Sequence, residues 1–219
     1  MSENIDNWQP HTPEEVRNPF AGLPVPWWIA GGWAIDLFLG RQTRPHGDID
    51  VLILRNDQLD VQEFLSDWDL HKTQQPGLKP WPKGEFLNSG VNDIWCRRTP
   101  DSPWSLQLML LDTQNGSWIF RRDRTITGPI DAIGRTTDLG IPYLSPEIQL
   151  LYKARSETLD KDDSDFCVCA PRLQPQAQVW LLSCLTKRFP DGHKWIEWIK
   201  ELRAQPSGRG DAEDRAPHP

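Results

Sequence analysis

The feature that most constrains the fold is the stretch from Trp27 to Arg55, where an apolar run, a glycine pair and an acidic pair follow one another. The run ends at Gly31-Gly32, and residues without a Cβ let the backbone turn sharply and approach a ligand. Apolar residues at helical spacing then continue to Gly40, a residue type that commonly ends helices. These patterns predict a strand, a tight turn and a helix.

The acidic pair stands at the head of a second predicted strand. Asp48-Ile49-Asp50 leads into the aliphatic run Val51–Leu54, which is typical of a strand buried on both faces. Side chains alternate along a strand, so Asp48 and Asp50 point the same way. Two adjacent carboxylates repel each other unless a cation lies between them, and hard oxygen ligands favour Mg²⁺ over zinc. The pattern predicts a metal site that handles phosphates.

The order of these elements resembles a known signature. A Gly-Gly turn, a helix, a link with Arg and His, and Asp-x-Asp before a strand resemble the polymerase-β-like nucleotidyltransferase superfamily. Within it, Gly31–Asp36 and His46–Val51 are most similar to the aminoglycoside and lincosamide nucleotidyltransferases. The stronger resemblance covers residues 27–55, and a looser one continues to about residue 200.

The resemblance implies a fold and an activity. The expected fold is α/β (α+β), with a mixed β-sheet nucleotidyltransferase core packed by helices and followed by a small C-terminal helical bundle. Asp48 and Asp50 would bind Mg²⁺, and the Gly31-Gly32 turn would face a nucleoside triphosphate, expected to be ATP. The expected reaction moves AMP to a hydroxyl of a small molecule, with an aminoglycoside-like antibiotic as one candidate acceptor, and releases pyrophosphate.

Further site residues are expected around this centre. Arg44 precedes the acidic pair, where a guanidinium can hold phosphate oxygens, although a surface ion pair is an equal alternative. His46 is expected on the same face, supporting the metal site. The sequence Lys-Asp-x-x-Asp at the start of a later helix resembles a family pattern, which implies that Lys161 meets a phosphate and Asp165 lies at the edge of the site. The acidic residues of this pattern have an equal alternative explanation, because the helix dipole favours negative charge at a helix N-terminus.

This chain departs from the family pattern mainly at one position. The family often supplies a third carboxylate from a strand that neighbours the Asp-x-Asp strand. The strand-forming run Trp104–Leu111 places Gln107 at that position. An amide oxygen can ligate Mg²⁺ but cannot take a proton from an acceptor hydroxyl. Asp112 has the opposite side-chain parity and is a poor substitute. Metal binding is therefore expected, whereas the acceptor would be deprotonated by Asp165, by a metal-bound hydroxide or by no strong base.

Composition excludes several classes of function. The net charge of −7 argues against general nucleic-acid binding, which depends on Lys and Arg neutralising phosphates. No apolar stretch approaches the roughly 20 residues of a membrane span, and the first ten residues lack the regions of a secretory signal, so a cytoplasmic location is expected. Zinc is not indicated, because no paired or zinc-like spacing occurs among Cys96, Cys167, Cys169 and Cys184.

Two other functions remain open from the sequence. One is nucleotidylation of a macromolecule, such as a tRNA end or a protein side chain, as toxin-like members of the superfamily perform. The other is a binding module that keeps nucleotide affinity without turnover, with Gln107 marking the loss. The negative net charge counts against tRNA.

Patterning divides the chain into four parts. These are an N-terminal tail with a short helix (1–26), the nucleotidyltransferase core (27–144), a C-terminal helical region (145–204) and a disordered tail (205–219). Within them we predict a capped helix from Thr12 and a hairpin at Asn115-Gly116. Further expectations are a helix over 57–68, an edge strand over 69–73, a loop over 74–88, irregular chain over 125–144, and helices from Ser145, over 176–188 and over 193–203.

Overall fold

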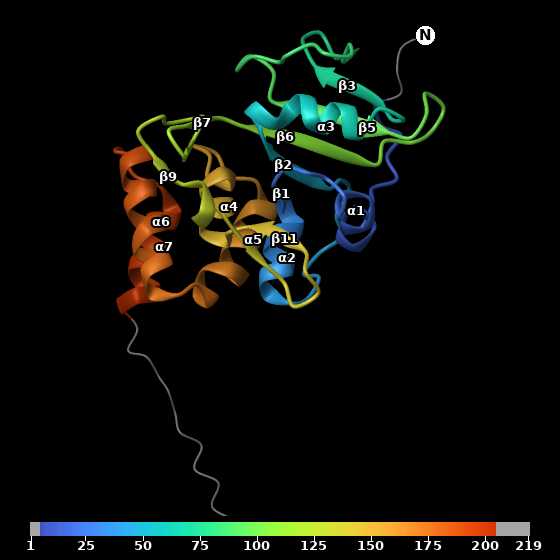
Figure 1. Ribbon diagram of the computed structural model, residues 1–219. Coiled ribbons are helices and arrows are strands. Elements are labelled where there is room, and N and C mark those ends of the chain that lie inside the picture. Colours follow the sequence, from blue (N-terminus) through green and yellow to red (C-terminus); the bar gives the residue numbers. More distant parts are fainter. Residues whose placement is uncertain (1–4, 205–219) are drawn as a thin grey trace, which may run out of the picture.

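The computed structural model describes residues 5–204, and its main feature is an eight-stranded mixed sheet (Figure 1). The strand order is β10-β11-β1-β2-β6-β5-β3-β4. The bounds of these strands are β1 Trp27–Ala30, β2 Asp50–Leu54, β3 Asp69–Thr73, β4 Leu78–Pro80, β5 Asp93–Arg97, β6 Leu106–Leu111, β10 Gly134–Thr136 and β11 Pro142–Leu144. A three-stranded sheet contains β7 Thr113–Gln114, β8 Ser117–Ile119 and β9 Thr127–Pro129.

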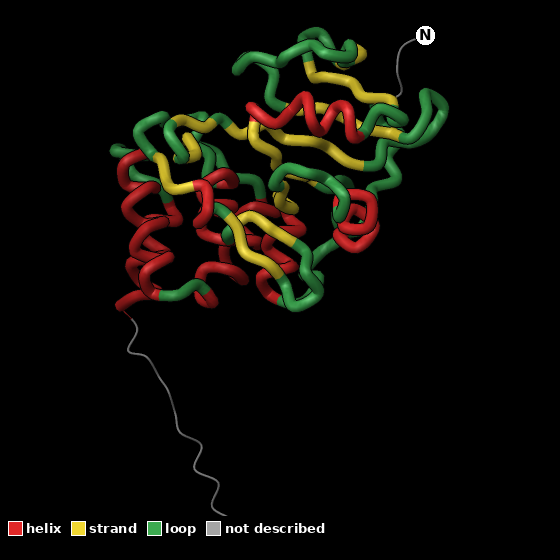
Figure 2. Tube along the Cα trace, in the orientation of Figure 1, coloured by secondary structure: helices red, strands yellow, loops and turns green. Residues whose placement is uncertain are grey.

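The helices of residues 5–204 gather mostly in the C-terminal half (Figure 2). Here α4 contacts α2, α5 and α6, and α6 packs against α7. The result is a helical group that contacts strands β1 and β11 of the main sheet through α2. The helix bounds are α1 Pro13–Phe20, α2 Gly31–Leu39, α3 Gln58–Phe64, α4 Pro146–Lys153, α5 Asp160–Cys169, α6 Pro175–Arg188 and α7 Lys194–Ala204.

The elements with local signals form as predicted. Thr12 and Glu15 complete a capping box at α1, with the amide of Thr12 donating to Glu15 Oε2 at 2.8 Å. Gly40 ends α2 with a φ of +68°. Strand β2 is buried from Val51 to Leu54, because it lies between β1 and β6 in the middle of the sheet. The predicted mixed-sheet fold class with packed helices is confirmed.

Several shorter elements differ from the predictions. Residues 74–88 include β4, which pairs with β3, so β4 and not β3 is the edge strand. Residues 125–144 contain β9, β10 and β11. The turn at Asn115-Gly116 forms, but β8 pairs with β7 and β9 and not with β6. The helix predicted over 57–68 is shorter. Such short strands are fixed by the partners with which they pair, which residue preferences do not report.

Two predictions about organisation stay predictions. The proposed boundary near residue 144 falls between β11 and α4, but α4 contacts α2 of the core. The predicted disordered tail, 205–219, lies outside the described residues. Within 5–204, no helix combines the length and apolar composition that crossing a bilayer requires.

Candidate active site

The glycine turn lies directly beside Asp50. Ala30 pairs with Asp50 across the antiparallel ladder of β1 and β2, which brings the next residue, Gly31, to the Asp50 side chain. Gly31 has a φ of +67°, and a Cβ at this position would stand 2.3 Å from Asp50 Oδ2. Its amide donates to Gln149 Oε1 at 2.8 Å, which ties the turn to α4. Only glycine fits this backbone conformation and this space.

Gly31→Ala is expected to lower the free energy of unfolding by roughly 1 to 3 kcal/mol, because alanine must adopt a left-handed conformation and displace Asp50. Urea unfolding of both proteins measures the difference. Gly47→Ala is the matched control, because Gly47 lacks a positive φ and has nothing within 4 Å of its Cβ position. Equal stabilities of the two variants would contradict the assigned strain.

Gly32 makes room for the link between α2 and β2. A Cβ on Gly32 would lie 2.4 Å from Arg44 Nη2 and 2.5 Å from His46 Cε1. The glycine pair therefore packs against Asp50 on one side and against the link on the other. Both glycines bring the N-terminus of α2 close to the acidic pair.

A cavity of 430 Å³ opens around this turn and combines acidic and basic side chains. Asp48, Asp50 and Asp93 line it, together with Asp162 from α5. The basic residues that line it are Arg44, Arg121, Arg122, Lys153, Arg155 and Lys161. Carboxylates beside several cations suit a metal-bound polyphosphate, since the carboxylates can hold the metal and some of the cations can hold the phosphates.

The third carboxylate of this cavity is Asp93, which the sequence reasoning missed. Gln107 does lie opposite Asp50 in the parallel pair of β2 and β6. Its Nε2 donates to Asp93 Oδ1 at 3.1 Å, and Asp93 begins β5 on the far side of β6. Gln107 therefore hydrogen-bonds a carboxylate that lines the cavity. An acid near the start of the short run of strand formers over 91–97 was the available signal, but the sequence did not reveal that this run forms a strand beside β6.

Burial raises the pKa of two of these acids. Burial, the neighbouring Asp48 and then Asp93 raise the pKa of Asp50 to about 7, and Lys153 and Lys161 oppose the shift only in part. Burial also raises the pKa of Asp93, although Arg121, the hydrogen bond from Gln107 and Arg55 act against it. The surroundings thus disfavour the charged forms of both acids, and a bound cation would offset this effect.

Asp165 lies outside the lining of this cavity and is held in an ion-pair cluster. It accepts hydrogen bonds from Arg44 Nε at 2.9 Å and Arg44 Nη2 at 3.0 Å, and Lys153 Nζ stands 2.8 Å from its Oδ2. Burial alone would raise the pKa of Asp165, but these two cations outweigh it and lower the pKa. The expected role of Asp165 as a base stays a prediction, and its carboxylate is held by Arg44 and Lys153. Arg44 lines the cavity, yet its guanidinium is largely committed to Asp165.

His46 supports the turn from the opposite side. Its Nε2 lies 2.5 Å from Asp36 Oδ2, and its ring packs on Trp33 with centroids 4.4 Å apart. Asp36 also accepts hydrogen bonds from the amide and hydroxyl of Thr43. The buried side chain of His46 therefore connects α2 to the segment between α2 and β2, and it does not line the cavity. Lys161, by contrast, lines the cavity with an exposed side chain.

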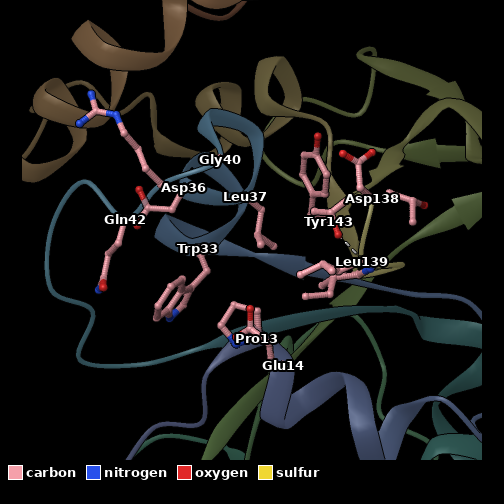
Figure 3. A pocket seen from close by; sticks show the side chains of 14 residues that line it. Pro13, Glu14, Trp33, Asp36, Leu37, Gly40, Gln42, Asp138, Leu139 and Tyr143 are labelled. Carbon is pink, nitrogen blue, oxygen red and sulfur yellow. Dashed lines mark hydrogen bonds between the residues drawn. The ribbon is translucent and has the colours of Figure 1, made fainter.

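A larger cavity of 510 Å³ lies along the flank of α2 (Figure 3), and none of the three carboxylates Asp48, Asp50 and Asp93 lines it. Trp33, Asp36 and Leu37 form one wall, and the turn around Leu139 forms another. The Asp36 carboxylate is already bonded to His46 and Thr43. The smaller cavity is therefore the candidate active site, because it alone combines the glycine turn with the acidic groups.

Comparison with known proteins points to one group of enzymes. The family model for aminoglycoside-2''-adenylyltransferase matches residues 14–77. A lincosamide resistance protein of Staphylococcus haemolyticus is 24% identical over 152 residues, which cover 68% of this chain and 87% of that protein. A 2''-aminoglycoside nucleotidyltransferase of Escherichia coli is 67% identical over 27 residues, 12% of this chain and 15% of the relative.

A solved structure supports the fold. The solution structure of the antibiotic-resistance factor ANT(2'')-Ia matches with a TM-score of 0.52 at 15% identity, covering 80% of this chain and 90% of that chain. The sequence signature, the family model and this shared fold agree. The chain resembles the polymerase-β-like nucleotidyltransferase superfamily and is similar to its aminoglycoside- and lincosamide-modifying branch.

Proposed function

We propose that the protein transfers AMP from ATP to a hydroxyl of a small molecule and releases pyrophosphate. The observation that carries this proposal is the meeting of Asp48, Asp50 and Asp93 in one cavity beside the Gly31-Gly32 turn. Relatives named for antibiotic modification support the transfer of a nucleotide to a small acceptor. Lincosamides and aminoglycosides are therefore the first acceptors to assay.

Asp48 and Asp50 fit a site for Mg²⁺. Their oxygens are the hard ligands that this ion prefers, and Mg²⁺ is commonly held by one or two carboxylates together with substrate phosphates. Within residues 5–204, no group of three or more His, Cys, Asp or Glu residues could hold a metal on its own, which agrees with a site completed by the nucleotide. Bound Mg²⁺ would neutralise charge on the phosphates and between the two acids.

The phosphates are expected at the N-terminus of α2. The amide of Gly31 is already bonded to Gln149, so the amides of the following residues in the first turn are the donors available to a phosphate. Lys161 lines the same cavity, and its side chain has no ion pair with any described residue. Lys153, paired with Asp162 and Asp165, adds positive charge nearby.

Asp93 is the group that we assign to accept the acceptor's proton. Its raised pKa brings it nearer to neutral pH, where a carboxylate is a better base. The hydrogen bond from Gln107 fixes its orientation. The acceptor oxygen would then bond to the α-phosphorus as the bond to the β-phosphate breaks, and the hydroxyl proton passes to Asp93.

The test is release of pyrophosphate by the full-length protein with ATP, Mg²⁺ and a panel of hydroxylated acceptors. We expect release that depends on both an acceptor and the metal, and that is lost in the Asp48→Asn/Asp50→Asn double variant. The adenylylated product is identified by mass spectrometry. Nucleotide binding without release for every acceptor would contradict transferase activity.

A further inference from the structure

One end of the catalytic cavity is unusually basic. Arg121 and Arg122 follow β8, Arg155 follows α4, and all three line the cavity. Arg188, at the end of α6, acts electrostatically on Arg122 together with the other two. Guanidinium groups from three separate parts of the chain thus gather near the Asp93 end; we call Arg121, Arg122 and Arg155 the arginine cluster.

The arginine cluster has no acidic partner among residues 5–204. None of its members forms an ion pair there, and Arg122 Nη1 donates only to the carbonyls of Tyr152 at 2.7 Å and Ala154 at 3.2 Å. Burial and the neighbouring arginines lower the pKa of Arg122, which is the sign of uncompensated positive charge. Other arginines near the cavity differ, since Arg44 is paired with Asp165.

The position of the arginine cluster is separate from the expected phosphate site. The glycine turn and Asp48 lie at the start of β2. Asp50 of β2 and Gln107 of β6 are paired, and the next pair on the same face of the sheet is Leu52 and Met109. This second pair lies further along both strands, away from the glycine turn. A small adjoining cavity is lined by Leu52, Met109 and Arg121. Arg121 also acts electrostatically on Asp93, so the cluster faces the group assigned to the acceptor.

We propose that the acceptor is a small hydroxylated anion whose phosphate or carboxylate group is held by Arg121, Arg122 and Arg155 while its hydroxyl reaches Asp93. This inference rests on the proposed function. The planar fork of a guanidinium matches the oxygens of phosphate and carboxylate groups. A polycationic acceptor would meet like charges at the same place, and like-charge contacts oppose binding. The hydroxyl oxygen forms the new bond to the α-phosphorus, pyrophosphate leaves, and the proton goes to Asp93.

Calorimetric titration of the full-length protein, saturated with Mg²⁺ and a non-hydrolysable ATP analogue, tests the acceptor class. The probes are glycerol 3-phosphate, glycerol and the polycation kanamycin A. We expect glycerol 3-phosphate to bind about tenfold or more tightly than glycerol, because hydrogen bonds to charged groups are the strong ones. Its affinity should fall as ionic strength rises, and kanamycin A should bind no better than glycerol.

Variants locate the binding. Arg121→Gln and Arg155→Gln should each remove most of the preference for glycerol 3-phosphate. Arg124→Gln is the matched control, because Arg124 lies on the same loop, has a side chain 64% exposed and does not line the cavity. Equal binding of the two glycerol probes, or tighter binding of kanamycin A, would overturn the anionic acceptor alone. Failure of the nucleotide analogue to bind would instead overturn the proposed function and the acceptor site with it.

Discussion

Replacing Asp93 with Asn is expected to lower kcat by about 10²- to 10⁴-fold, because an amide cannot accept the proton of the acceptor hydroxyl. Affinity for Mg-ATP should change little, since the expected metal ligands Asp48 and Asp50 remain. The pH profile of the wild-type kcat should show a basic group whose pKa lies above the ordinary range of an aspartate, in the direction that burial gives to Asp93. Steady-state kinetics and nucleotide titration measure both quantities.

Gln107→Ala separates orientation from chemistry in the same site. This variant removes the hydrogen bond to Asp93 but leaves the carboxylate, so we expect a smaller loss of kcat than in Asp93→Asn. Loss of the Gln107 bond also removes one influence that lowers the pKa of Asp93, so the acidic limb of the profile, where activity rises with pH, should move to higher pH. A larger loss in Gln107→Ala than in Asp93→Asn would show that the amide and not the acid carries the function.

Replacing Asp50 with Asn is expected to abolish transfer and yet stabilise the metal-free protein. The pKa of Asp50 rises from 3.8 to about 7 on folding, through burial and then through Asp48 and Asp93. A carboxylate with a raised pKa destabilises the fold increasingly as the pH rises from its unfolded value towards its folded one. At pH 8 without metal, we expect Asp50→Asn to gain on the order of 2 to 4 kcal/mol in the free energy of unfolding.

The pH dependence of this gain is the decisive part of the prediction. Below the folded pKa of about 7, Asp50 in the wild type takes up a proton, so the advantage of the variant should shrink as the pH falls towards 4. Denaturant unfolding in the presence of EDTA at several pH values measures it. Asp131→Asn, at an exposed position, is the control and should leave stability unchanged. A gain that grows towards acidic pH would contradict the charge repulsion assigned to Asp50.

The sequence was sufficient where the determinants are local. The glycine pair, the capped helix from Thr12 and the aliphatic run after Asp50 each carry their own signal within a few residues. The placement of Gly31 beside Asp50 also follows from local order, because a strand, a turn and a second antiparallel strand bring the two together. Sequence reasoning could therefore locate the centre of the cavity.

The remaining site depends on contacts between distant residues. Asp93 meets Gln107 only because β5 and β6 are neighbours, and no local pattern reports strand order. Asp165 was expected at the site edge, but it is bound by Lys153 of the preceding helix and by Arg44, which lies far away in the chain. Strand β11 is short, and it pairs with β1 from a distant part of the chain as well as with its neighbour β10.

The central claim is that Asp48 and Asp50 together hold a metal-bound nucleotide, and calorimetric titration with Mg-ATP tests it most directly. We predict that the wild type binds Mg-ATP, that binding weakens strongly when EDTA removes the metal, and that the Asp48→Asn/Asp50→Asn double variant, although folded, loses it. Unchanged affinity in that double variant would contradict the account.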